Sequence, residues 1–160
     1  MMSLCSEVLK ALAGKTLVTA ESCTGGLIGG TLTAVPGSSA VYKGGIICYS
    51  NWVKSHILGV SAVLLEQEGP VSRPVAEALA CGVREKLEAD VSVSVTGLAG
   101  PDGDEFGNPV GTVFIGCCAD GITLVREHHF AGDREAVRKQ AAEAALKMVL
   151  ECVDTGRIQL

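Results

Sequence analysis

The segment that decides the fold is residues 16–26, which read TLVTAESCTGG. Its first five residues form a mostly apolar run of the length of a buried strand, and the two glycines at its end favour a loop. Residues 27–32 are apolar or small, and Pro36-Gly37 follows, so a short helix is expected between them. A strand that leads through a glycine loop into a helix is typical of α/β proteins, which bind ligands at the carboxyl ends of their strands.

A second segment repeats this arrangement. Residues 91–101 read VSVSVTGLAGP, so another short strand ends in a glycine-containing loop, which extends to Pro109. Glycines let backbone N–H groups converge on an anion, and the N-terminus of a following helix adds a favourable dipole. One such loop serves equally well as a tight turn. Two of them on neighbouring elements predict a cradle for a phosphate or an oxyanion.

The other segments supply the remaining layers. Apolar periodicity and turn residues predict helices over residues 4–13, from Asn51 to Gly59, from Ser72 to Leu87 and from Asp133 to Cys152, a strand over 41–50, and a hairpin with strands 110–118 and 122–130. Helices that alternate with strands, together with one hairpin, predict a single domain over residues 1–160. Its expected architecture is a three-layer α/β/α sandwich with a mixed, largely parallel sheet and one antiparallel hairpin.

The composition agrees with this architecture and excludes two classes of partner. Hydrophobic residues make up 48% of the 160 residues but aromatic ones only 4%, so the core must consist of aliphatic side chains, as in a sheet covered by helices. The net charge is −5, and no stripe of lysine and arginine is present, so nucleic-acid binding is not expected. No segment has the ~18 uninterrupted apolar residues of a membrane span, so no membrane partner is expected.

The cysteines indicate a reducing compartment. All seven are scattered along the chain, and no CxxC pair occurs among them. Such cysteines are typical of reduced thiols that pack as small hydrophobic side chains inside the cell. The first residues lack the pattern of a signal peptide. We therefore expect a cytoplasmic protein.

No set of metal ligands emerges from the sequence. His128 and His129 are neighbours on a predicted strand and so face opposite sides of the sheet, and His56 stands alone. Asp102 and Asp104 imitate the start of a calcium loop, but apolar residues stand at its later ligand positions. The sequence contains neither a complete P-loop nor a dinucleotide-binding fingerprint. We therefore expect no metal and no cofactor.

Candidate catalytic residues lie at the ends of the predicted strands. Ser22 fits a nucleophile and a helix N-cap equally well. Cys23 is the stronger nucleophile chemically, but no histidine is placed to activate it, so a buried structural thiol is the better interpretation. Lys54 follows a glycine-marked strand and becomes a general base if burial lowers its pKa; otherwise it is a surface lysine. Arg134 and Arg138 lie one helical turn apart, and they either clamp a phosphate or face solvent.

Several segments resemble one known family in order. AESCTGG, residues 20–26, resembles the first signature of the CinA C-terminal domain family, whose stand-alone members are nicotinamide mononucleotide amidohydrolases. The further similar segments are PGSS at 36–39, YSN at 49–51 with Lys54, LGV at 58–60, GPVS at 69–72, TGLAGP at 96–101, PVGTV at 109–113 and GDR at 132–134 with Arg138. The resemblance covers about residues 5 to 150.

This resemblance implies hydrolysis of the carboxamide of nicotinamide mononucleotide to nicotinate mononucleotide and ammonia. It implies that Ser22 attacks the amide carbon without a metal, that Lys54 takes the serine proton, and that Tyr49 helps to hold the lysine. The substrate-binding residues that it implies are Cys23, Thr24, Gly25 and Gly26 around the oxyanion, Ser39 and Gly100, and the Thr96-Gly97 loop with Arg138 and Arg134 at the ribose phosphate.

Two positions depart from the family pattern. Asp104 stands where a second loop glycine is common, and Asn108 stands where a lysine usually precedes the Pro-Val-Gly segment. Loss of that positive charge is expected to weaken phosphate binding or to alter its geometry. The larger nucleotide-processing domain of full-length CinA proteins has no room in 160 residues, so we expect no pyrophosphatase activity of that domain.

Other functions fit the same residues. A glycine cradle can bind a nucleotide without reacting, which describes a non-catalytic regulatory module, and an interaction domain linked to competence or damage would instead require an exposed apolar patch. The expected partners are a small-molecule nucleotide and further copies of the same chain, in a dimer or a trimer. The predicted hairpin over residues 110–130 offers an edge or a face for such self-association.

Overall fold

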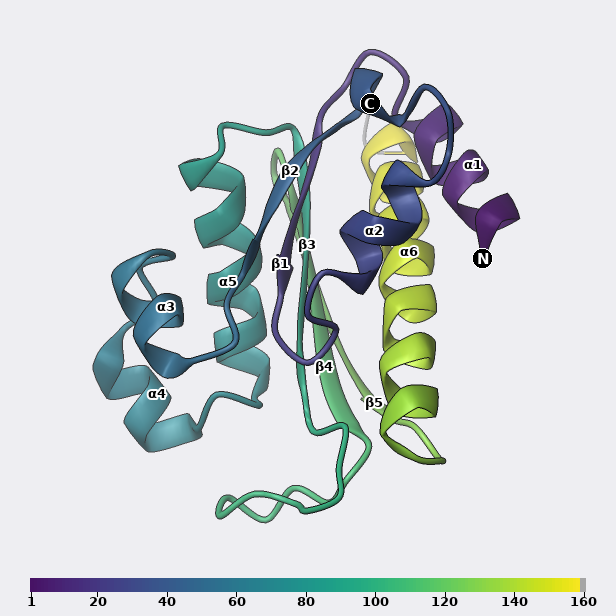
Figure 1. The fold of residues 1–160 in the computed structure, drawn as a ribbon. Helices are drawn as coiled ribbons and strands as arrows, with labels where there is room; N and C mark the ends of the chain where they lie inside the picture. The colour runs from purple at the N-terminus through teal and green to yellow at the C-terminus, as the bar shows by residue number, and fades with distance from the viewer. Residues whose placement is uncertain (159–160) are drawn as a thin grey trace.

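The computed structural model describes residues 1–158 as a five-stranded sheet with helices on both faces (Figure 1). The strands are β1 (Leu17–Glu21), β2 (Tyr42–Ile47), β3 (Val91–Gly97), β4 (Thr112–Ala119) and β5 (Ile122–His129). The helices are α1 (Met2–Ala11), α2 (Leu27–Thr33), α3 (Asn51–His56), α4 (Ala62–Glu68), α5 (Arg73–Lys86) and α6 (Arg134–Ile158), and a single 3-10 turn, η1 (Ser38–Ala40), precedes β2.

The sheet is mixed. Its order is β2-β1-β3-β4-β5. β1 lies between β2 and β3 and is parallel to both, whereas β4 is antiparallel to both β3 and β5. Of these five strands, four therefore run in one direction and β4 runs in the other. The prediction of a mixed, largely parallel sheet with one hairpin is confirmed.

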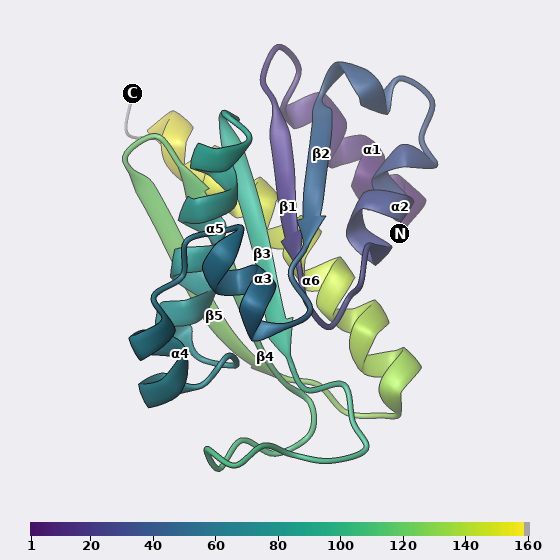
Figure 2. The ribbon, with the colours of Figure 1, turned by 60° about the vertical axis from the view of Figure 1, so that its left-hand side comes forward.

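Each face of the sheet carries its own helical layer. Helices α1, α2 and α6 cover one face, and α3, α4 and α5 cover the other, as Figures 1 and 2 show from two directions. The first layer buries Val93 of β3 against Leu146 of α6, and the second buries Val18 of β1 against Leu79 of α5. The predicted three-layer α/β/α sandwich is thus confirmed. No helix within residues 1–158 is long and apolar enough to cross a membrane.

Valine and serine alternate along β3, and this alternation explains how closely α5 packs against the sheet. Its valines face the α6 layer, while Ser92 and Ser94 donate hydrogen bonds to the α5 carbonyl oxygens of Ala80 and Ala76, both at 2.6 Å. Gly116 of β4 faces the same helix, because a Cβ there would lie 2.7 Å from the Ala76 oxygen. Small residues that satisfy helix carbonyls let α5 approach the sheet closely. This approach fixes the segment before α5, residues 69–72, beside the carboxyl end of β3.

The loops that matter for function gather at one edge of the sheet. Because β1, β2 and β3 are parallel, their carboxyl ends lie at the same edge. Residues 22–26 follow β1, residues 48–50 follow β2, and residues 98–111 follow β3. Figure 1 shows all three at the lower end of the sheet. The two glycine loops therefore lie at the end where open α/β sheets bind their ligands.

Serines stand at the N-caps of α3 and α5. Ser50, not Asn51, is the N-cap of α3, and its hydroxyl oxygen accepts a hydrogen bond from the Val53 N–H at 3.3 Å. Ser72 stands at the N-cap of α5, but its hydroxyl donates to the Gly69 carbonyl oxygen instead of accepting from the helix. The short helix α4 was not predicted, because seven residues are too few to display a helical period.

Candidate active site

Ser22 and Lys54 meet where the loops after β1 and β2 come together. Ser22 is the first residue after β1, and Lys54 lies on α3. The Lys54 Nζ is 3.1 Å from the Ser22 Oγ, and both side chains are buried, with Lys54 only 1% exposed. A lysine amine at this distance is placed to take the proton of the serine hydroxyl.

Backbone carbonyl groups hold the Lys54 amine. Nζ donates to the carbonyl oxygens of Cys48 at 2.7 Å and of Tyr49 at 3.4 Å. Nζ also donates to Ser22 Oγ. When the amine is neutral, the two carbonyl groups can take both of its N–H bonds, and its lone pair is then free to accept the O–H of Ser22. Burial lowers the pKa of Lys54 below 10.5, the value of an unperturbed lysine. Burial therefore shifts the equilibrium of this amine toward its neutral form, which is the form that acts as a base.

A cavity of about 260 Å³ opens over this pair. The predicted site residues that line it are Ser22, Cys23, Tyr49, Lys54, Thr96, Gly97, Gly100 and Arg134. Its lining also contains residues that were given no role from the sequence, namely Asn51, Pro70, Val71, Leu98, Ala99 and Asp102. Most of these additional residues fall inside the family-like segments at 49–51, 69–72 and 96–101, which is the signal that could have identified them. The cavity is close to the lower end of the size range of small-molecule sites.

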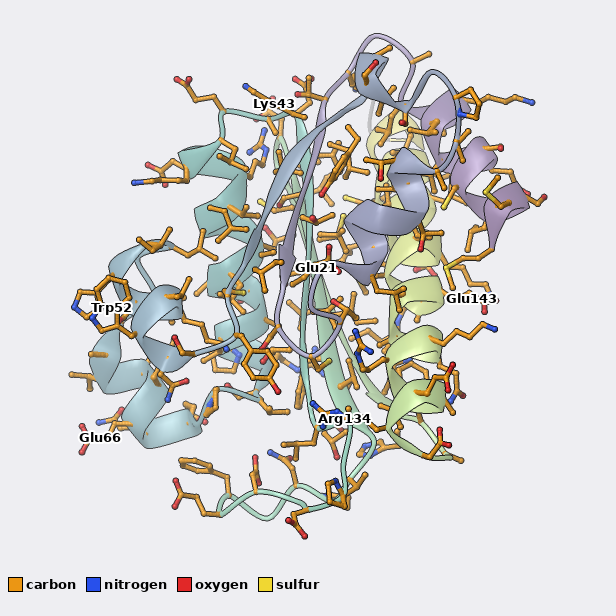
Figure 3. The ribbon with its side chains drawn as sticks, viewed as in Figure 1. Glu21, Lys43, Trp52, Glu66, Arg134 and Glu143 are labelled. Atoms are coloured by element: carbon orange, nitrogen blue, oxygen red, sulfur yellow. The ribbon has the colours of Figure 1, made fainter. Side chains whose placement is uncertain are left out.

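Tyr49 and Arg134 meet at the mouth of the cavity. The phenol of Tyr49 accepts a hydrogen bond from Arg134 Nη2 at 3.1 Å, so Tyr49 contacts Lys54 through its backbone carbonyl and not through the side chain. Arg134 Nη1 also donates to the carbonyl oxygen of Gly100. Arg134 therefore ties the loop after β2 to the loop after β3. Figure 3 shows it at the end of the sheet from which the 98–111 loop extends.

Glu21 is a buried carboxylate to which the sequence patterns gave no role. One of its oxygens accepts hydrogen bonds from Thr24 Oγ1 at 2.8 Å and from the Ile28 N–H at 2.9 Å, and the other accepts from the Gly29 N–H at 3.0 Å. Glu21 thus occupies the N-terminus of α2. The N–H groups of Ile28 and Gly29 at this helix end are therefore not free for a substrate anion, because a carboxylate of the chain already binds them.

Five predicted substrate-binding residues do not line the cavity, namely Thr24, Gly25 and Gly26 of the loop after β1, Ser39 and Arg138. Arg138 Nε donates to the Cys23 carbonyl oxygen and Nη2 donates to that of Thr24, each at 3.0 Å, so the guanidinium holds the backbone of the loop. Ser39 is exposed in η1, at the amino end of β2, and therefore lies at the opposite end of the sheet from Ser22. The structure of this chain does not bring Ser39 to the cavity.

The two departures from the family pattern contact each other. One carboxylate oxygen of Asp104 accepts the backbone N–H of Asn108 at 2.9 Å, and Asn108 Nδ2 donates to the other at 2.8 Å. Nδ2 also donates to the carbonyl oxygen of Val71 at 3.1 Å, which fastens the 98–111 loop to the segment before α5. Asn108 therefore supports the loop through hydrogen bonds, where a lysine would present a charge.

We expect Asn108→Ala to lower the free energy of unfolding by about 1 kcal/mol, because the Val71 carbonyl and the Asp104 carboxylate both lose a hydrogen bond. Glu105→Ala, at an exposed neighbouring position, is the matched control and should change the stability by less than about 0.5 kcal/mol. Urea unfolding of the wild type and both variants measures the difference. Equal midpoints for the wild type and Asn108→Ala would contradict this role.

The histidines are occupied by other contacts. The His56 ring stacks on Trp52, the His128 ring stacks on Phe130, and His129 Nε2 lies 3.0 Å from a carboxylate oxygen of Glu127. Within the described part of the chain, no group of three His, Cys, Asp or Glu residues is arranged to hold a metal ion.

Known proteins share much of this sequence. The model of the CinA C-terminal domain family matches residues 2–153. A protein of Halothermothrix orenii named putative competence-damage inducible protein is 47% identical over 89% of this chain and 35% of its own length. A protein of Enterobacter agglomerans named nicotinamide-nucleotide amidohydrolase PncC is 51% identical over 82% of this chain and 80% of its own length.

Solved structures share the whole fold. A CinA superfamily protein of Escherichia coli superposes with a TM-score of 0.91 at 38% identity, covering 93% of this chain and 88% of that one. One from Klebsiella pneumoniae 700603 gives 0.93 at 33% identity, covering 96% of this chain and 98% of that one. The chain spans about a third of the length of several curated relatives that it matches. On the family model and these relatives, the chain belongs to the CinA C-terminal domain family.

Proposed function

We propose that this chain hydrolyses the carboxamide of nicotinamide mononucleotide to nicotinate mononucleotide and ammonia. The observation that carries the proposal is the buried Lys54 amine, 3.1 Å from the Ser22 hydroxyl at the cavity. A neutral amine beside a serine supplies the base and the nucleophile of acyl transfer, which is the reaction class of amide hydrolysis. The substrate is supported by the printed name of the Enterobacter agglomerans relative.

In the first half-reaction, Ser22 Oγ attacks the carboxamide carbon and Lys54 Nζ takes the hydroxyl proton. The carbonyl oxygen becomes an oxyanion. Within residues 1–158 the backbone N–H groups of Cys23 and Thr24 donate to no backbone carbonyl, so we assign them as its donors. The C–N bond then breaks as Lys54 returns the proton to the leaving nitrogen. Ammonia departs, and an ester on Ser22 remains.

In the second half-reaction, water attacks the ester carbon. Lys54 takes a proton from this water and delivers it to the oxygen of Ser22 as the ester C–O bond breaks. The serine hydroxyl is restored, and the released carboxylic acid ionises at neutral pH. The same lysine thus serves as base and then as acid in each half-reaction.

Arg134 holds the phosphate in this proposal. It lines the cavity, and its guanidinium contacts two neutral groups, the Gly100 carbonyl and the Tyr49 phenol. A guanidinium can bind phosphate with two parallel hydrogen bonds. The phosphate therefore belongs at the side of the cavity formed by the loop after β3.

We expect Cys23→Ala to retain ammonia release within about tenfold of the wild-type rate, because the thiol is not the nucleophile. Cys23 is only 6% exposed, and burial raises its pKa to about 11, so the unreactive thiol form predominates at neutral pH. Steady-state ammonia release measures the effect. Loss of turnover comparable to that of a Ser22 variant would instead make Cys23 the nucleophile.

A non-catalytic nucleotide-binding or regulatory module is the second candidate. It is supported by relatives whose names refer to competence and damage, and by a cavity that can bind without reacting. The Lys54 environment favours the enzyme. Burial of an amine costs free energy, and the acceptors around it are two carbonyl groups and the Ser22 hydroxyl. A module that only binds a nucleotide has no function that requires a buried amine beside a serine.

The test is a product analysis with the purified chain and nicotinamide mononucleotide, in the presence and absence of a chelator. The proposal predicts equal amounts of nicotinate mononucleotide, separated by anion exchange, and ammonia, measured by a coupled assay, with no effect of the chelator. Calorimetric binding of the nucleotide without either product would favour the regulatory module.

A further inference from the structure

The loop that carries the nucleophile is held from two sides by charged side chains. We call residues 22–26 the nucleophile loop. From one side, the buried Glu21 carboxylate binds the Thr24 hydroxyl and the N-terminus of α2. From the other side, Arg138 of α6 donates to two carbonyl oxygens of the loop, those of Cys23 and Thr24. The side-chain and main-chain groups of Thr24 are thus fixed by opposite charges.

Arg138 determines which way two peptide groups of this loop face. In a planar trans peptide the N–H points opposite to the C=O. Since the Cys23 and Thr24 carbonyls point to the guanidinium, the N–H groups of Thr24 and Gly25 point away from it. The Gly25 N–H donates to the Ser22 carbonyl oxygen at 3.0 Å and closes the turn, whereas the Thr24 N–H has no partner within residues 1–158. Arg138 therefore orients an unused amide donor close to the nucleophile.

A role for Arg138 as a phosphate ligand does not fit this geometry. Its side chain does not line the cavity, and its Nε and Nη2 groups bond loop carbonyl oxygens at 3.0 Å each. Arg134, one turn earlier on α6, does line it. Although the two arginines share a helix face, one is directed to the substrate space and the other to the backbone behind the nucleophile.

We infer that Arg138 is a positioning residue for the Thr24 N–H, one of the two proposed oxyanion donors of the nucleophile loop; this inference rests on the proposed amidohydrolase function. The guanidinium accepts no proton and touches no reacting atom. It fixes the peptide planes, and its charge polarises them, which strengthens their N–H groups as donors. The planar fork reaches two carbonyl oxygens at once, so a lysine, which is a compact point charge, cannot replace it.

The test compares Arg138→Lys and Arg138→Met with Arg134→Met as the matched control. Each is assayed with nicotinamide mononucleotide and with nicotinamide riboside, which lacks the phosphate. Both Arg138 variants should lower kcat by about 10²-fold on both substrates and leave KM within about threefold, because a donor to the transition state is misplaced. Arg134→Met should raise KM for the mononucleotide far more than KM for the riboside. This pattern would separate positioning from phosphate binding.

Rescue separates positioning from a general structural effect. In Arg138→Ala, free guanidinium ion at non-denaturing concentration should restore part of kcat, whereas ammonium ion at the same concentration should not, because only the planar ion bonds both carbonyls. A wild-type kcat in Arg138→Lys, or an Arg138→Met defect confined to KM for the mononucleotide, would overturn the inference and make Arg138 a phosphate ligand.

A labelling measurement remains decisive if the proposed function fails. If the wild type releases ammonia from neither substrate, the proposed function is wrong. The rate at which a sulfonyl fluoride modifies Ser22 still reports the same donors, since a sulfonyl oxygen takes the place of the oxyanion. The inference predicts labelling of the wild type at least about tenfold faster than of Arg138→Lys. Equal labelling rates would overturn it independently of any amidase activity.

Discussion

Replacement of Ser22 by alanine is expected to lower ammonia release from nicotinamide mononucleotide by at least about 10⁴-fold, since loss of a serine nucleophile removes the covalent route entirely. The dissociation constant of the nucleotide should change little, because the lost oxygen lies at the floor of the cavity and Arg134 still holds the phosphate. Steady-state ammonia release and calorimetry measure the two quantities.

Ser38→Ala is the matched control for this substitution. Ser38 is 8% exposed and Ser22 is 7% exposed, but Ser38 lies in η1, at the opposite end of the sheet. Its replacement should leave the rate near that of the wild type. Retention of activity by Ser22→Ala, with the same products, would remove Ser22 as the nucleophile and direct attention to the neighbouring Cys23.

Lys54→Met should lower kcat by about 10³-fold, the typical contribution of a general base. Methionine keeps the length of the side chain but cannot accept the proton of Ser22, so the hydroxyl stays un-ionised. Lys43→Met on β2 is the control, because that lysine is exposed and its Nζ bonds the carbonyl oxygen of Glu88. A Lys54→Met variant that turns over at the wild-type rate would exclude a lysine base and favour a binding module.

The pH dependence tests the same lysine. Only the neutral amine acts as a base, and burial lowers the pKa of Lys54 below 10.5. The rate kcat/KM should therefore rise with pH through that lowered pKa and fall as the amine becomes protonated at lower pH. Lys54→Met should lose this ascending limb, and Lys43→Met should keep it. If the ascending limb of the pH profile persisted in Lys54→Met, it would report the titration of another group.

The fold was predictable because its signals are local. The strand of residues 16–20 and its glycine loop specify one unit, residues 91–101 specify another, and an α/β sheet brings the carboxyl ends of parallel strands together. The meeting of Ser22 with Lys54 was expected from the family resemblance. The burial that lowers the pKa of Lys54 became visible only once the acceptors around its amine were placed.

The roles that the sequence did not predict depend on the direction in which each side chain points. The spacing of residues along the chain carries no information about that direction. Arg134 and Arg138 share a helix face, yet one guanidinium lines the cavity and the other bonds the backbone behind it. Glu21 stands in the most recognisable motif, but only its contacts with the α2 N–H groups show that it occupies a helix end expected to bind the substrate. Ser39 was grouped with the site through its motif, although parallel pairing of β1 and β2 places it at the far end of the sheet.

The central claim is an ester between Ser22 and the substrate, and trapping with hydroxylamine tests it most directly. Hydroxylamine competes with water for the ester, and its attack produces the hydroxamate of nicotinate mononucleotide. The chelator-treated wild type should form this hydroxamate in increasing proportion as hydroxylamine is raised, and Ser22→Ala should form none. Ammonia release that continues without any hydroxamate would show that water attacks the amide directly, and it would contradict a serine nucleophile.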